Sequence, residues 1–213
     1  MDLKVVKIKI CGLKRYQDID YVNELKVDYA GFVFAKSPRR VDLQHAERLI
    51  ARLDKGIRKV GVFVNQSREF IKEACSALGL DVVQLHGDET PDEVAAYAVY
   101  GVEVWKAIRV KGEDGLVRAG EYRVDGILLD AAVQGRYGGT GQTFDWGLLE
   151  GVSFNSKLIL AGGLNSHNVC SAIARVKPYA VDVSSGVETG GFKDYKKMKE
   201  FVERVRSFEK HNR

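Results

Sequence analysis

The segment Lys59–His86, KVGVFVNQSREFIKEACSALGLDVVQLH, decides the fold class. It opens and closes with apolar runs rich in β-branched residues, Lys59–Val64 and Val82–His86, which we predict to be strands. The apolar positions that would share one helix face between them are Phe70, Ile71, Ala74, Cys75 and Leu78. Because an apolar helix face needs a sheet to cover, the segment predicts a strand, a helix and a second strand packed together.

The same alternation of strand and helix continues in both directions along the chain. Eight runs rich in Val, Ile and Phe predict strands, and most are continuously apolar, as parallel strands buried on both faces are. The expected strands are Val5–Cys11, Tyr29–Phe34, Lys59–Val64, Val82–His86, Val102–Val110, Asp125–Asp130, Lys157–Ala161 and Ala180–Ser184.

Helix signals lie between these runs. Asp42 is a suitable N-cap for a helix after the second strand. Thr90, Pro91 and Glu93 form a capping box with proline in the first turn of another helix. A last helix is indicated by apolar residues at helical spacing, namely Tyr195, Met198, Phe201, Val202, Val205 and Phe208.

Eight strand–helix units are compatible with two architectures, a closed parallel barrel and a doubly wound open sheet. An open sheet of this kind usually carries a glycine-rich nucleotide turn, and the sequence has neither that pattern nor a Walker motif. Gly139-Thr140-Gly141 starts like such a turn, but Phe144 stands where its last glycine would be. No linker-like stretch divides the chain. We therefore predict an α/β protein of one domain, residues 1–213, folded as a (β/α)8 TIM barrel with parallel strands.

The composition is that of an ordinary soluble globular protein, with 45% hydrophobic and 29% charged residues. Lys and Arg number 33 against 29 Asp and Glu, a net charge of +4 that suits a small anionic ligand and is too weak to indicate nucleic acid. The three cysteines, Cys11, Cys75 and Cys170, fit neither a disulfide framework nor a metal site. The sequence shows no signal-peptide pattern and no apolar run of about 18 residues. We expect a cytoplasmic protein without nucleic-acid or membrane partners.

In a parallel barrel the active site forms where the strands end, and here those ends are polar. Cys11 ends the first strand beside Gly12, so its thiol would face the mouth of the barrel and could serve as a base. A free thiol has a pKa of about 8.5, and an electropositive mouth would lower it. The alternative is a small buried apolar side chain, which is the interpretation we prefer for Cys75 and Cys170.

Two aspartates lie at or near strand ends. Asp130 follows three apolar residues, where a carboxylate is costly to bury unless it binds or reacts with something. This makes Asp130 the candidate general acid, and its alternative role is to cap the segment that follows. Asp182 lies within the eighth strand, where it could support the site from inside the barrel or pair with a polar neighbour.

Basic side chains follow two other strands. Arg39 and Arg40 come after the second strand, where a guanidinium can bind a carboxylate through two parallel hydrogen bonds, while one of the two could simply be solvated. His86 ends the fourth strand and could carry a proton, but we favour a structural role for it.

Three glycine-rich segments at strand ends predict a phosphate site. Without a Cβ, backbone N–H groups can approach an anion, and barrels often bind phosphate after their last two strands. Each segment alone could be only a tight turn, but three that converge favour phosphate. The residues concerned are Gly139, Thr140, Gly141, Gly162, Gly163, Ser184, Ser185 and Gly186.

The strand ends also match a known family, in order, along nearly the whole chain. The matching stretches are KICG at 9–12, GFVF at 31–34 with SPR at 37–39, VGVFVN at 60–65, VQLHG at 83–87, LLD at 128–130, GGTG at 138–141 with FDW at 144–146, LAGGL at 160–164 and VDVSSGVE at 181–188. Together they closely resemble the phosphoribosylanthranilate isomerases of tryptophan biosynthesis. The resemblance implies a (β/α)8 barrel that converts N-(5-phosphoribosyl)anthranilate into 1-(2-carboxyphenylamino)-1-deoxyribulose 5-phosphate by an Amadori rearrangement.

By this resemblance Cys11 is the general base, Asp130 is the general acid, and Arg39 binds the anthranilate carboxylate, while the glycine-rich segments bind the phosphate. Asp130 would protonate the furanose oxygen so that the ring opens to an iminium, and Cys11 would then remove the C2′ proton. Because the iminium nitrogen takes up the electrons, no metal and no cofactor is implied. The small phosphorylated substrate is the expected partner, and the protein is expected to be a monomer or a homodimer.

Two segments depart from the family pattern. Residues 13–15, Leu-Lys-Arg, lack the small hydroxyl residue that is common in the family at this place. Residues 189–194 form a shorter segment than in the family and lack a proline often seen there.

Two rival hypotheses are another phosphate-binding barrel, such as the indole-glycerol-phosphate synthase or tryptophan synthase α type, and a non-catalytic phosphosugar sensor. The former chemistries depend on a lysine or on paired carboxylates, and the sensor needs no reactive thiol.

Overall fold

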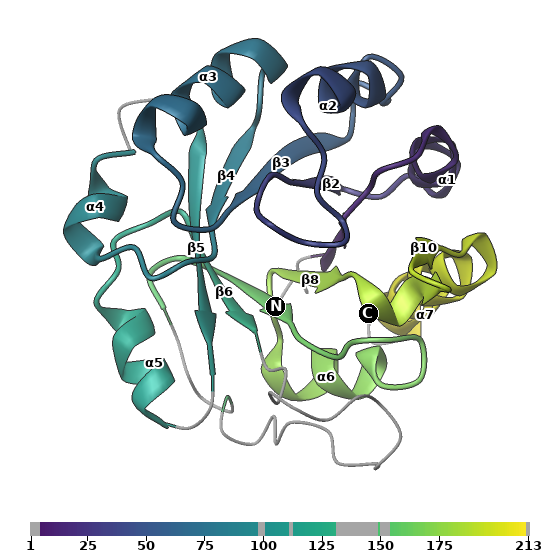
Figure 1. Cartoon of the computed structure of the whole chain (residues 1–213). Helices are drawn as coiled ribbons and strands as arrows, with labels where there is room; N and C mark the ends of the chain where they lie inside the picture. The colour runs from purple at the N-terminus through teal and green to yellow at the C-terminus, as the bar shows by residue number, and fades with distance from the viewer. Residues whose placement is uncertain (1–4, 98–100, 111–112, 131–148, 150–153, 212–213) are drawn as a thin grey trace.

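A computed structural model describes residues 5–97, 101–110, 113–130, 149 and 154–211 (Figure 1). Eight strands form a closed barrel in which each strand pairs in parallel with the next along the chain, and the eighth pairs with the first. The strands are β1 (Lys7–Cys11), β2 (Tyr29–Val33), β3 (Arg58–Phe63), β4 (Val82–Leu85), β5 (Glu103–Arg109), β6 (Gly126–Asp130), β7 (Lys157–Ala161) and β8 (Ala180–Val183). The predicted TIM-barrel fold is confirmed.

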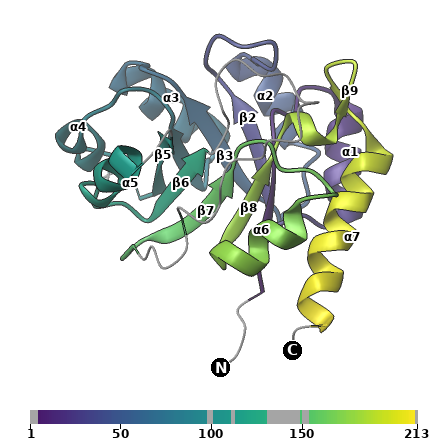
Figure 2. The same cartoon turned by 90° about the horizontal axis from the view of Figure 1, so that it is seen from below.

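Helices surround the strands as an outer ring (Figure 1). They are α1 (Tyr16–Leu25), α2 (Leu43–Ile50), α3 (Arg68–Leu78), α4 (Pro91–Ala95), α5 (Glu113–Gly120), α6 (Val169–Val176) and α7 (Tyr195–His211). The last helix lies between α6 and α1, so the two ends of the ring meet there (Figure 2). Between β8 and α7 the chain forms a single 3-10 turn, η3 (Ser185–Val187), and a short hairpin of β9 (Glu188–Thr189) and β10 (Phe192–Lys193).

The helix starts follow the predicted caps. The Asp42 carboxylate accepts the backbone N–H of His45 at 2.7 Å, and Thr90 and Glu93 form a reciprocal capping box with Pro91 in the first turn. The strand ends differ slightly from prediction. The first strand begins at Lys7, and five predicted strands end one residue earlier than expected because their last residue already belongs to the loop at the mouth.

Apolar side chains fill two layers separated by the barrel wall. The outer layer lies between strands and helices, and it includes Ile8 and Ile10 of β1. The inner layer fills the barrel and includes Cys11, Tyr29, Val62, Trp105, Leu128 and Ile159. Since side chains alternate along a strand, Lys9 and Cys11 point inward while Ile8 and Ile10 point outward.

Within the described residues, none of the helices combines the length and apolar character that crossing a bilayer requires.

Candidate active site

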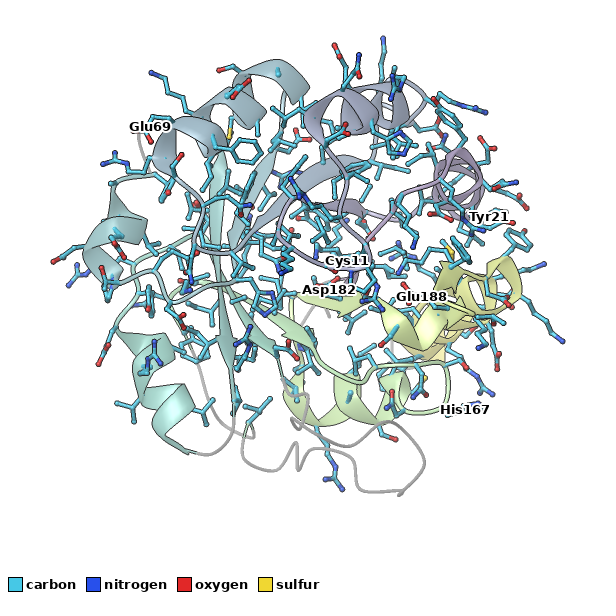
Figure 3. The ribbon with its side chains drawn as sticks, viewed as in Figure 1. Cys11, Tyr21, Glu69, His167, Asp182 and Glu188 are labelled. Atoms are coloured by element: carbon cyan, nitrogen blue, oxygen red, sulfur yellow. The ribbon has the colours of Figure 1, made fainter. Side chains whose placement is uncertain are left out.

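Cys11 and Asp130 are the last residues of β1 and β6, so both lie at the mouth of the barrel. Figure 3 shows Cys11 near the barrel axis, with Asp182 and Glu188 close by in the same view. The structure therefore places the predicted base and the predicted acid at the same end of the barrel, on strands separated along its wall.

The Cys11 thiol sits in a space that neighbouring glycines leave open. A Cβ at Gly31 of β2 would lie 3.0 Å from both the Cα and the Sγ of Cys11. Gly12 adopts a left-handed φ of +83°, which turns the chain sharply out of the barrel directly after the thiol. The Ser184 hydroxyl donates a 3.0 Å hydrogen bond to the Cys11 carbonyl and so ties the ends of β8 and β1 together.

Burial and charge act on the Cys11 thiol in opposite directions. Burial raises its pKa, and the negative charge of Asp182 adds to this, while the ammonium groups of Lys9 and Lys193 lower it. The cations act in the direction expected for an electropositive mouth. Burial outweighs them, however, so the pKa of Cys11 is raised above its ordinary value.

Asp130 has a histidine beside it. The Nε2 atom of His86 lies 3.5 Å from Asp130 Oδ2, and both side chains are about one-fifth exposed, at 22% and 23%. Gln84 Nε2 is 3.4 Å from the other ring nitrogen of His86. Although the sequence favoured a structural role for His86, the fold brings it to the candidate acid across β4, β5 and β6. The capping alternative for Asp130 involves residues 131–148, which lie outside the described residues.

Arg39 already holds a carboxylate at the mouth. Its Nε and Nη2 atoms donate to the two oxygens of Glu188 at 2.8 and 2.7 Å, and Lys193 Nζ donates to Glu188 Oε1 at 2.6 Å. These two cations outweigh the effect of burial and lower the pKa of Glu188 to about 2. The two parallel bonds of Arg39 are thus made to a carboxylate of the protein itself, while Arg40 is exposed.

Two of the three predicted phosphate segments meet at the mouth. Gly162 and Gly163 after β7 have left-handed φ values of +89° and +66°, and a Cβ at Gly186 would lie 1.9 Å from the Leu164 carbonyl oxygen. Only glycine allows this close approach of the two loops. Ser184 and Ser185 lie in the same turn as Gly186, whereas Gly139, Thr140 and Gly141 lie outside the described residues.

The two segments that depart from the family pattern contact each other. The Lys14 ammonium and the Arg15 guanidinium lie over the Phe192 ring, 4.6 and 4.7 Å from its centroid, and Arg15 Nη2 donates to the Lys193 carbonyl at 2.7 Å. Lys14 Nζ also donates to the Pro38 carbonyl at 3.1 Å. Both departures therefore belong to one contact that joins the loops after β1 and β2 to the hairpin after β8.

Comparison with known proteins identifies the family. A family model described as N-(5'phosphoribosyl)anthranilate (PRA) isomerase matches residues 8–204. The chain belongs to this family. The N-(5'-phosphoribosyl)anthranilate isomerase of Thermoanaerobacter sp. (strain X514) is 53% identical to it over 202 residues, which cover 95% of this chain and 98% of that relative.

Solved structures of phosphoribosylanthranilate isomerases share the fold. The crystal structure of the Thermotoga maritima enzyme is 41% identical, covers 95% of this chain and 99% of its own, and gives a TM-score of 0.85. A crystal structure of a phosphoribosylanthranilate isomerase in complex with reduced 1-(o-carboxyphenylamino)-1-deoxyribulose 5-phosphate is 38% identical with a TM-score of 0.80, over 95% of this chain and 99% of that one.

For this member of the phosphoribosylanthranilate isomerase family, the sequence located Cys11 and Asp130 but gave no role to several charged side chains around them. In the sequence, Lys9 is one of several lysines that alternate with apolar residues near the N-terminus, so nothing sets it apart. Lys193 and Glu188 lie in a segment with no strand or helix signal. Their importance depends on contacts between residues far apart in the chain. The resemblance to VDVSSGVE did contain Glu188, which was the available signal.

Proposed function

We propose that the protein catalyses the rearrangement of N-(5-phosphoribosyl)anthranilate to 1-(2-carboxyphenylamino)-1-deoxyribulose 5-phosphate in tryptophan biosynthesis, with Cys11 as general base and Asp130 as general acid. One observation supports the proposal above others. A buried thiol and a carboxylate end two strands at the same mouth, in a chain that belongs to the PRA isomerase family. The activity is that of an isomerase acting by proton transfer.

The reaction needs one proton donor and one proton acceptor. Protonated Asp130 gives its proton to the furanose ring oxygen, the C1′–O bond breaks, and the nitrogen lone pair forms the iminium. The Cys11 thiolate then takes the C2′ proton, and the C–H electron pair moves into the C1′–C2′ bond while the iminium π electrons return to nitrogen. The resulting enol-amine tautomerises to the ketose. His86, 3.5 Å from Asp130, is placed to stabilise the carboxylate that remains after the first step.

Arg39 is the proposed ligand of the anthranilate carboxylate. A guanidinium has five N–H donors, so the two that bind Glu188 leave others for a second carboxylate. Glu188, which also accepts from Lys193, holds the Arg39 side chain beside Gly12, where a Cβ would meet Arg39 Cδ at 2.5 Å. Arg39 therefore binds substrate from a fixed position next to the thiol.

The phosphate is proposed to bind the backbone of Gly162, Gly163 and the Ser184–Gly186 turn, together with Gly139, Thr140 and Gly141. Support comes from the left-handed glycines after β7 and from the close approach of the β7 and β8 loops. Residues 1–213 are proposed to act as one domain, as a monomer or homodimer in the cytoplasm. The net charge of +4 suits an anionic small molecule rather than nucleic acid or a membrane.

Steady-state kinetics of two variants test the proposal. Cys11→Ser and Asp130→Asn should each lower kcat by about 10² or more, the usual scale for a positioned acid or base, and should leave the fold intact. Matched controls are Cys75→Ser on α3 and Asp92→Asn on the exposed start of α4, which should keep normal activity. The assay follows the loss of substrate fluorescence and confirms the ketose product by chromatography.

The same assay separates the rival functions. Near-normal turnover in either site variant would contradict the role of that residue. Loss of substrate without formation of the ketose would favour another phosphate-binding barrel enzyme, and binding without turnover would favour a phosphosugar sensor.

A further inference from the structure

A lysine and an aspartate are paired inside the barrel, directly below the candidate base. Lys9 Nζ lies 2.8 Å from Asp182 Oδ2, and the two side chains are 0% and 9% exposed. They sit opposite each other in the register of β1 and β8. TIM-barrel interiors are usually filled by Val, Ile and Leu, and a buried ion pair rarely stabilises a fold more than apolar side chains of similar volume would. Stability alone therefore does not account for this pair.

Lys9 faces the same way as the thiol. It precedes Cys11 by two residues on β1, so both side chains project into the barrel. The positive charge of the Lys9 ammonium lowers the pKa of Cys11 and so opposes the effect of burial. An ammonium has three N–H donors, so Lys9 can serve Asp182 and Cys11 together.

Asp182 binds Lys9 through only one of its two carboxylate oxygens. Its Oδ2 accepts the bond from Lys9, while its Oδ1 is buried and has no hydrogen-bond partner among the described side chains and backbone. A buried carboxylate with one oxygen lacking a hydrogen bond lowers the folding stability unless its negative charge stabilises a neighbouring cation. Here the charge keeps Lys9 protonated in the barrel interior, and the pKa of Lys9 is raised despite complete burial.

We propose that Lys9, anchored by Asp182, is the cation that stabilises the thiolate form of Cys11 during proton abstraction. Lys9 is then a positioning residue, and this inference rests on the proposed role of Cys11 as the base. In the step itself the thiolate accepts the C2′ proton and becomes a neutral thiol, while Lys9 stays an ammonium and Asp182 a carboxylate. The pair therefore ends the step in the state in which it began.

The other charged groups that face Cys11 are less well placed for this task. Lys193 approaches from β10 and Arg39 from the loop after β2, and each interacts with the thiol through its charge. Both are held by Glu188, at 2.6 Å for Lys193 and at 2.7 Å for Arg39, whereas Lys9 lies on the same strand as the thiol, two residues before it. Among these cations Lys9 has the largest effect on Cys11, and it is completely buried.

Titration of the thiol tests the inference without using activity. In a Cys75→Ser/Cys170→Ser background, Cys11 is the single cysteine, and its thiolate is followed by ultraviolet absorbance and by the rate of alkylation with iodoacetamide against pH. Lys9→Met should raise the pKa of Cys11 by about one pH unit or more, because an opposite charge nearby is lost. Asp182→Asn should raise the same pKa, because Lys9 loses the anion that keeps it protonated in the barrel interior, and Lys9 acts on the thiol more strongly than Asp182 does.

Lys9→Arg keeps the positive charge and should leave the pKa of Cys11 near its wild-type value, which distinguishes a charge effect from loss of structure. Lys106→Met is the matched control: Lys106 is also fully buried and paired, with Glu89 at 2.7 Å, but it lies on β5, and its removal should leave the Cys11 titration unchanged.

An unchanged pKa in Lys9→Met, or a rise in Lys9→Arg as large as that in Lys9→Met, would overturn the inference. If Lys9→Met does not fold, the upward shift in Asp182→Asn decides it, and a lowered or unchanged pKa there overturns it. A Cys11→Ser enzyme with normal turnover, combined with the expected titrations, would instead contradict the proposed function alone.

Discussion

Removing the charge of Glu188 should destabilise the protein at neutral pH. The Glu188 carboxylate accepts two hydrogen bonds from Arg39 and one from Lys193, at 2.6 to 2.8 Å, and its side chain is 8% exposed. Glu188→Gln keeps the shape of the side chain but leaves both cations without their anion. The perturbation therefore isolates the electrostatic part of the contact.

The pKa of Glu188 gives the size of the effect. It falls from an ordinary 4.5 to about 2 in the folded protein. At 1.36 kcal/mol for each pKa unit, this corresponds to at most about 3 kcal/mol of folding free energy. Arg39 is 28% exposed at the rim, so solvent screens part of the interaction, and we expect a loss of about 1–2 kcal/mol.

The sign of the pH dependence follows from the lowered pKa. The carboxylate stabilises the folded state fully above the unfolded pKa of 4.5, and this stabilisation is lost as the pH falls towards the folded pKa of about 2. The free-energy difference between wild type and Glu188→Gln should therefore be largest at neutral pH and shrink between these two values.

Urea unfolding monitored by tryptophan fluorescence measures this difference at neutral pH and at pH values below 4.5. Glu203→Gln on α7 is the matched control, because Glu203 is 63% exposed and its 4.0 Å contact with Lys199 should contribute almost nothing. Equal stability of Glu188→Gln and wild type at neutral pH, or a difference that grows as the pH falls, would show that the Glu188 charge does not stabilise the folded state.

Two further variants test substrate binding. Arg39→Ala should raise KM by about tenfold or more through loss of charge-assisted hydrogen bonds to the substrate carboxylate. Arg40 is exposed, and Arg40→Ala should leave KM unchanged. An unchanged KM for Arg39→Ala would place the carboxylate-binding site elsewhere. Gly186→Ala adds a Cβ 1.9 Å from the Leu164 carbonyl oxygen and should weaken competitive inhibition by inorganic phosphate, whereas Gly56→Ala, with open space around it, should not. Equal inhibition constants for Gly186→Ala and wild type would separate the phosphate site from these loops.

Local patterns were sufficient to predict the barrel and the placement of Cys11 and Asp130 at its mouth. Apolar runs define the eight strands because parallel strands are buried on both faces, and Cys11 and Asp130 stand out because they are polar residues at the ends of such runs. The capping residues Asp42 and Thr90 act within one helical turn, so they too are visible in the sequence.

Interactions between distant segments could not be predicted in this way. Lys9 and Asp182 are 173 positions apart, and Arg39 and Glu188 are 149 positions apart, so each pair depends on how the barrel closes. The direction of the Cys11 pKa shift also depends on the closed barrel. It is set by the balance between burial and the nearby cations, and neither can be measured from the sequence.

Cys11 is proposed to remove the C2′ proton of phosphoribosylanthranilate. Turnover of substrate carrying deuterium at C2′ tests it most directly, with wild type and Cys11→Ser assayed side by side for rate and for deuterium released to solvent. Wild type should show a primary isotope effect and release deuterium, and Cys11→Ser should lose both turnover and release. Wild-type levels of deuterium release from Cys11→Ser would contradict it.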